Sequence, residues 1–190
     1  MTGRSRMAAF IGVLAIPLTA GAQSIAVGVK SGVSLTSRLD ATDPPYRDAS
    51  RRYAIGPMVE VSLPHRFSVE ADVLFRREGF DRSAPTPVTF VRANRWEFPL
   101  LAKRRFGAIC AGAGVAYERL TGVGPTVELR HRAALGVTAA VGFERRWHAL
   151  RVSPEVRYVH WGERNFGTRG ARLASRLDQV EILLGISFGN

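Results

Sequence analysis

The feature that most constrains this chain is a strict alternation of apolar and polar residues, seen clearly in residues 67–76, FSVEADVLFR. The apolar set runs from Phe67 to Phe75, and the intervening set includes Glu70 and Asp72. A period of two residues places the two sets on opposite faces of a β-strand. In a soluble barrel the apolar face forms the core, whereas in a membrane barrel it contacts lipid. The alternation is compatible with both, so other features of the sequence must separate them.

The same alternation recurs in eight segments of 10 to 13 residues. A tilted strand needs about 9–11 residues to cross a bilayer, so each segment is long enough. Helical spacing of apolar residues at i, i+3, i+4 and i+7 does not compete with this pattern. The segments predict an all-β protein whose strands cover residues 24–36, 53–62, 67–77, 95–105, 108–119, 133–144, 150–161 and 178–188.

The connections between these segments are alternately short and long. The short ones are residues 63–66, 106–107 and 145–149. The long ones are polar and contain Gly, Pro, Asp and Arg, at residues 37–52, 78–94, 120–132 and 162–177. This alternation is typical of an even-numbered outer-membrane barrel, which has short periplasmic turns and longer external loops. It therefore favours an eight-stranded antiparallel up-and-down transmembrane β-barrel.

Aromatic residues on the apolar face lie near both ends of the strands. If the first strand runs outward from the periplasm, the outer set is Tyr53, Phe75, Trp96, Tyr117 and Tyr158. The periplasmic set is Phe67, Phe106, Phe143 and Phe188. Two aromatic girdles around an aliphatic band are typical of a lipid-facing wall. A soluble core would place its large rings near the middle of the strands, so we expect the apolar face to contact lipid.

The polar face is rich in Gly and Ala, which suits the narrow interior of an eight-stranded barrel. By parity it also carries five basic and eight acidic residues, namely Glu60, Glu70, Asp72, Arg76, Glu97, Lys103, Arg105, Glu118, Glu144, Arg151, Glu155, Arg157 and Glu181. Buried charges must pair or meet water. The expected network joins Glu70, Asp72 and Glu97 to Arg76, Lys103, Arg151 and Arg157. Because side chains fill so small a barrel, we expect a plugged lumen rather than a gated ion path.

Three prolines, Pro57, Pro99 and Pro154, lie inside predicted strands. Proline has no N–H to donate, and a closed barrel has no free edge where that loss is harmless. We expect β-bulges at these positions, or water in place of the missing donor.

The first 22 residues have the features of a secretory signal. Arg4 and Arg6 precede an apolar stretch at residues 7–20, and small residues follow it at a cleavage site. The expected organisation is a signal peptide over residues 1–22 and an outer-membrane barrel domain over residues 23–190. Cys110 is the only cysteine, so no internal disulfide can form.

The net charge is +11, or +9 once Arg4 and Arg6 are removed with the signal. Basic proteins often bind nucleic acid, but export and the scattered basic residues argue against that partner. The expected partners are outer-membrane lipid and the acidic head groups of lipopolysaccharide. The alternative is that the charge only solvates the loops. We expect a monomer.

Residues 95–106, RWEFPLLAKRRF, resemble the bacterial outer membrane protein β-barrel domain families, which include PorT-like and OmpA-like small barrels. The residues that match are Glu97, Pro99, Leu100, Leu101, Lys103 and Phe106. The Gly-rich residues 109–120 fit the strand that commonly follows. The resemblance implies that barrel-assembly machinery reads an aromatic residue near the C-terminus, here Phe188. It implies a fold more than a function, because one fold hosts many functions.

Lipid A deacylases share the eight-stranded outer-membrane barrel and carry a His-x-Ser pair with an acidic partner. His160 occupies about that place here, but Gly162 stands where the serine is needed, and Glu163 is the nearest acid. Thr168 or Ser175 would have to supply the hydroxyl. The four histidines are well separated, and we expect no catalytic, metal or cofactor site. The predicted function is a structural or surface-interaction barrel, with a deacylase-like enzyme and a narrow pore as alternatives.

Overall fold

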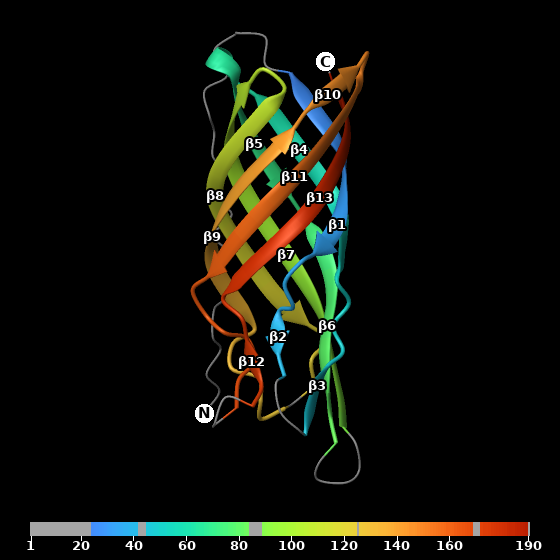
Figure 1. Cartoon of the computed structure of the whole chain (residues 1–190), viewed down its shortest axis with the longest axis vertical. Helices are drawn as coiled ribbons and strands as arrows, with labels where there is room; N and C mark the ends of the chain where they lie inside the picture. Colours follow the sequence, from blue (N-terminus) through green and yellow to red (C-terminus); the bar gives the residue numbers. More distant parts are fainter. Residues whose placement is uncertain (1–23, 42–44, 84–88, 125, 169–171, 190) are drawn as a thin grey trace, which may run out of the picture.

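Eight long antiparallel strands form the wall of a closed barrel (Figure 1). The computed structural model describes residues 24–41, 45–83, 89–124, 126–168 and 172–189, so the expected signal peptide lies outside the described residues. The wall consists of β1 (Ile25–Ser34), β4 (Tyr53–Ser62), β5 (Phe67–Asp72) continued by β6 (Leu74–Arg82), β7 (Thr89–Phe106), β8 (Ile109–Thr121), β9 (Ala133–Phe143), β11 (Leu150–Trp161) and β13 (Asp178–Gly189). The short elements are β2 (Leu39–Asp40), β3 (Tyr46–Asp48), the 3₁₀ turn η1 (Pro64–Arg66), β10 (Arg145–Trp147) and β12 (Ala174–Ser175). Among the described residues, no helix is long and apolar enough to cross a membrane.

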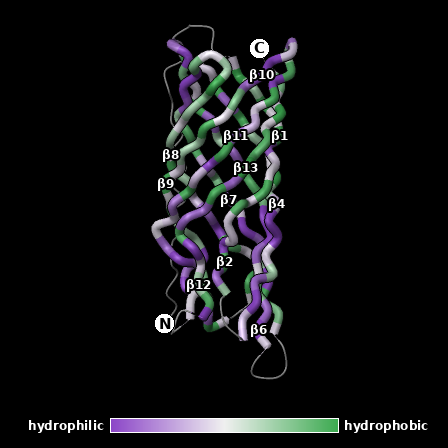
Figure 2. The backbone as a smooth tube through the Cα atoms, in the orientation of Figure 1, coloured by the Kyte–Doolittle hydropathy of each residue, from purple (hydrophilic) through white to green (hydrophobic). Residues whose placement is uncertain are grey.

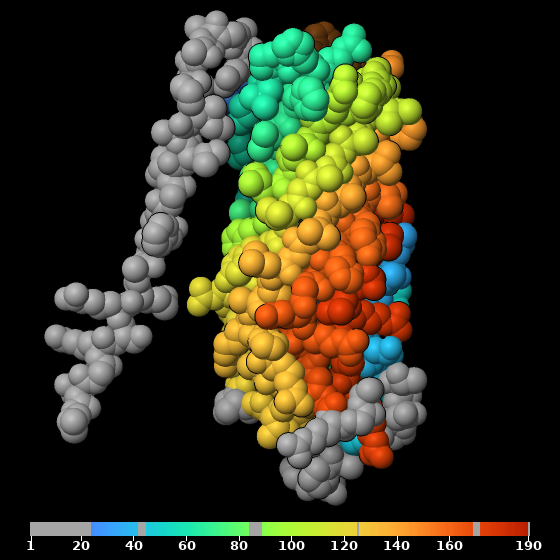
Figure 3. Space-filling model, turned by 90° about the vertical axis from the view of Figure 1, so that its left-hand side faces the viewer, coloured from blue at the N-terminus to red at the C-terminus, as the bar shows by residue number. Residues whose placement is uncertain are grey.

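The barrel closes because β1 pairs with both β13 and β4, while the other wall strands pair with their neighbours in the chain. The predicted all-β, eight-stranded, antiparallel up-and-down barrel is thereby confirmed. The tilt of the strands can be derived from their register. Moving once around the barrel from Ile25 on β1, from each residue to its paired neighbour, leads back to β1 at Leu35, ten residues further along. The partners on the way are Val61, Val69, Ala102, Ala113, Ala139, Tyr158 and Val180. A displacement of about 33 Å across about 38 Å of paired strands corresponds to a tilt of about 40°, and Figure 3 shows the strands as diagonal bands.

The two ends of the barrel differ. The turn end, at the top of Figure 1, carries η1, a two-residue turn at Gly107 and the β10 turn. Gly107 has a φ of +67°, a left-handed conformation that suits glycine. The loop end, at the bottom of Figure 1, carries β2, β3 and β12 together with the outer part of β6 and β7.

The sequence predicted a loop over residues 78–94, and this prediction was wrong. β6 continues to Arg82, β7 begins at Thr89, and β3 adds a third strand to this projecting hairpin. Apart from Phe90, the outward face of the hairpin lacks large apolar residues, so the alternation that marks the wall is absent there. We name these three strands the projecting sheet.

Most side chains that point outward from the wall are apolar, whereas those that point inward are mostly charged, polar or small, with a few buried apolar residues such as Leu74 and Leu183. Figure 2 shows hydrophobic and hydrophilic residues alternating along the wall strands. All nine predicted girdle residues point outward; Phe75 is half-buried, and the others are 37–60% exposed. Phe75 also contacts Trp96, with ring centroids 5.1 Å apart. The interior is tightly filled, since a Cβ at Gly185 would lie 2.5 Å from the Ser153 Oγ. This explains the small residues on the inner face.

The largest apolar core lies at the loop end, beyond the charged interior. We name it the cap, and its buried members are Leu39, Phe80, Ala93, Leu120, Val123, Phe166 and Leu173. The β2–β12 pair and the loop after β8 contribute to it alongside the ends of the wall strands. The cap thus joins the four long connections into one packed unit over the barrel mouth.

The expectation of bulges at the prolines was wrong. Pro99 and Pro154 lie opposite Ala116 and Leu184 in ladders whose register does not change on either side. Pro57 also keeps its register, and its carbonyl accepts a hydrogen bond from Val73 N at 3.0 Å. Pro57 has no N–H to donate the matching hydrogen bond of the ladder, and the missing bond lies where β5 and β6 are interrupted. Each proline therefore costs one backbone hydrogen bond and needs no inserted residue.

Candidate functional site

The charged interior is organised as three layers along the barrel axis. The central layer contains three cations and three carboxylates, namely Lys30, Lys103, Arg157, Glu70, Asp72 and Glu155. The Lys103 Nζ lies 2.7 Å from both Glu70 Oε2 and Glu155 Oε2. The Arg157 Nη2 lies 2.7 Å from Asp72 Oδ2 and from Glu155 Oε1. Each carboxylate contacts at least two cations, so the layer carries no net charge.

The layer nearest the turn end is a ring of four residues. Arg105 and Arg151 each pair with both Glu60 and Glu144. The Arg151 Nη1 lies 2.9 Å from Glu60 Oε2, and its Nε lies 3.0 Å from Glu144 Oε1. The expected pairing of Arg151 with Glu70, Asp72 or Glu97 was therefore wrong, because strand tilt places Arg151 one layer closer to the turn end.

The layer nearest the loop end lies directly under the cap. Arg76 pairs with Glu181 and, at 3.0 Å, with Glu97. Arg95 lies 2.9 Å from Glu97 and 3.4 Å from Glu118. Thus all thirteen charged residues predicted for the interior point inward, and the structure distributes them over the three layers.

Four charged interior residues were missed by the sequence reasoning: Lys30, Arg38, Glu78 and Arg95. Lys30 and Arg95 were accessible to the same parity argument, since both occupy the inner face of a predicted strand. Glu78 was not identified because residues 78–94 were predicted to form a loop. Arg38 comes from a connection, and its Nη2 reaches Glu118 at 2.6 Å; no strand pattern signals such a residue.

The interior side chains leave little open space. In the central layer no charged side chain is more than 6% exposed. An ion passing along the axis would have to separate pairs that are shielded from water, where charge separation is costly. Several polar atoms, among them Arg157 Nε and both Glu78 carboxylate oxygens, have no hydrogen-bond partner among the described residues. The described interior is thus nearly neutral and is filled by paired side chains.

Glu128 is the polar anchor of the cap. Its carboxylate accepts hydrogen bonds from Tyr46 Oη at 3.0 Å, Arg82 Nη1 at 2.6 Å and the Thr126 hydroxyl. Burial favours the neutral acid, but these donors outweigh it and lower the pKa of Glu128. Burial and the neighbouring Glu128 raise the pKa of Tyr46. The carboxylate thereby fixes the projecting sheet to the loop after β8.

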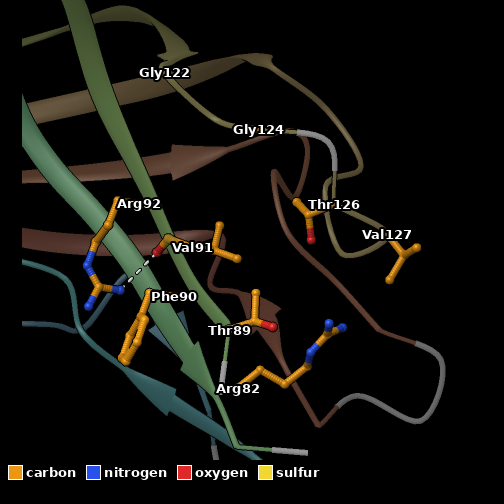
Figure 4. Close-up of a pocket in the computed structure, with 9 residues that line it drawn as sticks. All are labelled: Arg82, Thr89, Phe90, Val91, Arg92, Gly122, Gly124, Thr126 and Val127. Carbon is orange, nitrogen blue, oxygen red and sulfur yellow. Dashed lines mark hydrogen bonds between the residues drawn. The ribbon is translucent and has the colours of Figure 1, made fainter. Parts of the chain in front are cut away.

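A cleft of about 710 Å³ opens beside this anchor (Figure 4). One wall is the outer part of β7 with Arg82, and the other is the loop from Gly122 to Val127. In Figure 4, Thr89 and Val91 lie on the side of β7 that faces this loop, whereas Phe90 and Arg92 lie on the opposite side. The projecting sheet therefore has an inner face toward the cap and an outer face toward the surroundings.

His160 lies on the outward surface near the loop end. Its Nδ1 is 2.8 Å from Asp178 Oδ1, and Tyr158 Oη donates to the same oxygen at 2.5 Å. The acid beside His160 is therefore Asp178, not the expected Glu163, which lies 3.3 Å from His131.

The two hydroxyls considered for catalysis are engaged elsewhere. Ser175 Oγ is buried and accepts from Phe166 N, and Thr168 Oγ1 contacts the backbone of Leu173. Within the described part of the chain, no group of three or more His, Cys, Asp or Glu side chains has the arrangement of a metal site.

Two solved structures resemble this barrel. The outer membrane protein Ail of Yersinia pestis, determined in a phospholipid bilayer nanodisc, matches 88% of this chain and 98% of its own, with 11% identity and a TM-score of 0.50. The crystal structure of the attachment invasion locus protein Ail of Yersinia pestis, in complex with the heparin analogue sucrose octasulfate, covers 88% and 97%, with 9% identity and a TM-score of 0.47. No protein-family model matches the chain, and no curated protein matches it. The likeness to the nanodisc structure shows a shared outer-membrane-type barrel fold, while the PorT-like or OmpA-like affiliation stays a resemblance.

Proposed function

We propose that this chain is an integral outer-membrane β-barrel with a structural or surface-interaction role and a side-chain-plugged polar lumen. The observation that carries the proposal is the polarity of the wall, with apolar side chains outside and paired charges inside. Monomeric soluble proteins rarely expose contiguous apolar patches beyond a few hundred Å². A belt around the whole barrel exceeds that, and lipid is the surrounding that suits it.

The lengths of the connections support an orientation. The turn end faces the periplasm and the loop end faces outward, which is the usual arrangement of short and long connections. Phe188, 58% exposed on the turn-end margin, is the aromatic residue that barrel-assembly machinery would read. Wall strands use both edges in closing the barrel, so no edge needs a second copy. We therefore propose a monomer.

The paired layers favour a structural role over a pore. Three cations meet three carboxylates in the centre, and two meet two at the turn end. A narrow pore needs mobile water along its axis, whereas these side chains contact one another directly. The plug stiffens the wall and leaves the loop end as the surface that meets other molecules.

The basic loop end supports lipopolysaccharide as the partner. Arg51, Arg77, Arg119 and Arg132 are exposed at or beyond the outer girdle. Each basic residue near an anionic membrane surface contributes about 1 kcal/mol of attraction. Phosphate groups of the outer leaflet lie at the level where these side chains end.

Ester hydrolysis of an outer-leaflet lipid is the second candidate function. The observation in its favour is the pairing of His160 with Asp178, since a carboxylate orients an imidazole in many hydrolases. Its nucleophile would have to be water, because Ser175 and Thr168 are engaged in the loop. Mass spectrometry of lipid A from cells with and without the protein tests this candidate. Loss of an acyl chain that depends on His160 would establish the enzyme.

Cell fractionation and gel mobility test the main proposal. The mature chain is expected in outer-membrane fractions, and its unheated form should migrate differently from its boiled form, as closed barrels do. Recovery as a soluble periplasmic protein would contradict the proposal. Conductance across planar bilayers separates the plug from the pore, and we expect no stepwise currents.

A further inference from the structure

The outer face of the projecting sheet is a cluster of arginines. Arg47 on β3, Arg77 on β6, Arg92 on β7 and Arg51, between β3 and β4, line a shallow cleft of about 580 Å³. We name these four residues the arginine face. Figure 4 shows Arg92 turned to this side of β7, away from the cap. The small residues Ala49 and Ser50 also line the cleft, so long ligand groups can approach the strands.

Two of the four arginines face each other directly. Arg51 N donates to Arg77 O at 2.9 Å, which places Arg51, in the connection between β3 and β4, opposite Arg77 on β6. Like charges in directly opposed positions destabilise a sheet. Within the described part of the chain, neither Arg51 nor Arg77 forms an ion pair with a carboxylate, whereas Arg92 lies 2.7 Å from Asp81.

The remaining carboxylates near the cleft do not relieve this repulsion. Asp48 and Glu78 also line the cleft. They alternate with the arginines along β3 and β6, and among the described residues neither forms an ion pair with Arg51 or Arg77. Asp48 accepts hydrogen bonds from Ser37 and from Ser50 N, and Glu78 lies under the cap. An external anion is the group that would neutralise the arginine face.

The arginine face continues directly from the outer aromatic girdle. On the same outward face, Arg51 precedes Tyr53, Arg77 follows Phe75, and the Trp96 ring packs on Phe75. Tyrosine and tryptophan mark the interface between hydrocarbon and head groups. Arginines one strand step beyond the girdle therefore lie at the level of lipid phosphates.

We propose that the arginine face binds the phosphate groups of a phosphorylated saccharolipid in the outer leaflet, with Arg51 and Arg77 as the central pair. A guanidinium offers a planar fork of donors that matches phosphate oxygens, and two opposed forks can hold one phosphate between them. The acyl chains of the same lipid would lie on Tyr53, Phe75 and Trp96 below. This site rests on the proposed outer-membrane location, and continuity with the apolar wall is the reason for choosing a lipid over a free polyanion.

Native mass spectrometry of the full mature chain in zwitterionic micelles tests the site. The probe is diphosphorylated lipid A, compared with its dephosphorylated form, on the wild type and on Arg51→Gln/Arg77→Gln. We expect the double variant to lose affinity about 25-fold for the diphosphorylated form, at about fivefold per arginine. Affinity for the dephosphorylated form should not change. Without lipid, the variant should unfold at the same or a higher temperature, because the opposed charges are gone.

The matched control is Arg145→Gln/Arg146→Gln, which removes the same charge from the exposed turn end. It should bind lipid A like the wild type, and an equal loss of affinity in the control would overturn the site. Equal binding by Arg51→Gln/Arg77→Gln and wild type would also overturn it.

Tight binding of inositol hexakisphosphate without lipid A binding would replace the lipid by a free polyanion and contradict the proposal. If the protein is folded and located in the outer membrane but fails these binding tests, only this site is refuted. If it is absent from the outer membrane, the proposed function is refuted.

Discussion

The barrel interior and the cap use the same strand faces with opposite polarity. On the inner face of β6, Arg76 lies in the barrel and Phe80 in the cap, only four residues apart. The outer face of the same strand changes in the opposite sense, from the girdle residue Phe75 to the exposed Arg77. β7 repeats both changes. The proposed outer-membrane location accounts for both changes, because the medium around the strand would then change from lipid to water at this level.

The difference shows what binary patterning does and does not encode. Alternation fixes which residues share a face, and the surrounding medium decides whether the apolar or the polar set is enclosed. In the barrel the enclosed set must be satisfied by ion pairs, whereas in the cap it packs as an ordinary apolar core. The two regions should therefore respond differently to the same kinds of substitution.

The largest effect is expected from breaking the central layer. Arg157→Met would leave Asp72 and Glu155 buried with fewer cations, and we expect a loss of about 3–5 kcal/mol in the free energy of unfolding. Urea unfolding of the protein in micelles, followed by gel mobility, measures it. Adding Asp72→Asn to the variant should recover part of the loss. If Arg157→Met were as stable as the wild type, the ion pairs of the central layer would not contribute to the stability of the barrel.

A charge on the lipid-facing surface is the next largest perturbation. Leu100 lies on the outer face of β7 between Trp96 and Phe106, and it is 48% exposed. Leu100→Arg should destabilise the folded barrel in bilayers by about 2–4 kcal/mol, the cost of arginine near the midplane. The matched control, Val127→Arg, alters a residue that is 82% exposed in the loop beyond the girdle, and it should change stability by less than about 0.5 kcal/mol. Equal effects from the two variants would mean that the wall does not contact lipid.

The wall was predictable from the sequence because its pattern is long and regular. Strands 53–62 and 150–161 begin and end where they were expected, and parity placed Glu70 inside and Phe67 outside. The projecting sheet was not predictable by the same means. Except for Phe90 its outward face carries no large apolar residue, so the strand signal disappears although the backbone ladder continues to Arg82.

The contacts within the interior were only partly predictable. Parity identifies which charges point inward, but partner choice depends on strand tilt, which moves Arg151 to a different layer from Glu70. Arg38 and Glu128 come from connections, and a period of two residues carries no information about them. The arginine face likewise depends on the pairing of Arg51 with Arg77, which only the fold reveals.

A smaller effect is expected from opening the apolar core of the cap. Leu173→Ala removes a fully buried side chain and should weaken the cap by about 2 kcal/mol, at the lower end for buried leucines because the loops can relax. Limited proteolysis of the loop end in intact cells should become faster, while the heat-dependent gel shift of the barrel stays unchanged. A loss of the gel shift would show that cap and wall are not separable units.

The smallest effect concerns the pH dependence of the cap. The pKa of Glu128 is lowered in the folded state, so its contribution is complete above the unfolded value near 4.5 and is lost as the pH falls through the lower folded value. As the pH falls below 4.5 this contribution declines, and once the pH passes the lower folded pKa the carboxylate takes up a proton, its bonds from Arg82 and Tyr46 weaken, and proteolysis of the cap should accelerate. Glu128→Gln should weaken the cap at neutral pH by about 1 kcal/mol and remove the acceleration of proteolysis at acid pH.

The control is Glu163→Gln, which alters an exposed acid outside the cap and should keep the acceleration at acid pH. An acid response that persists in Glu128→Gln would place the sensitive group in the interior layers, where protonation of the paired carboxylates would loosen the wall itself.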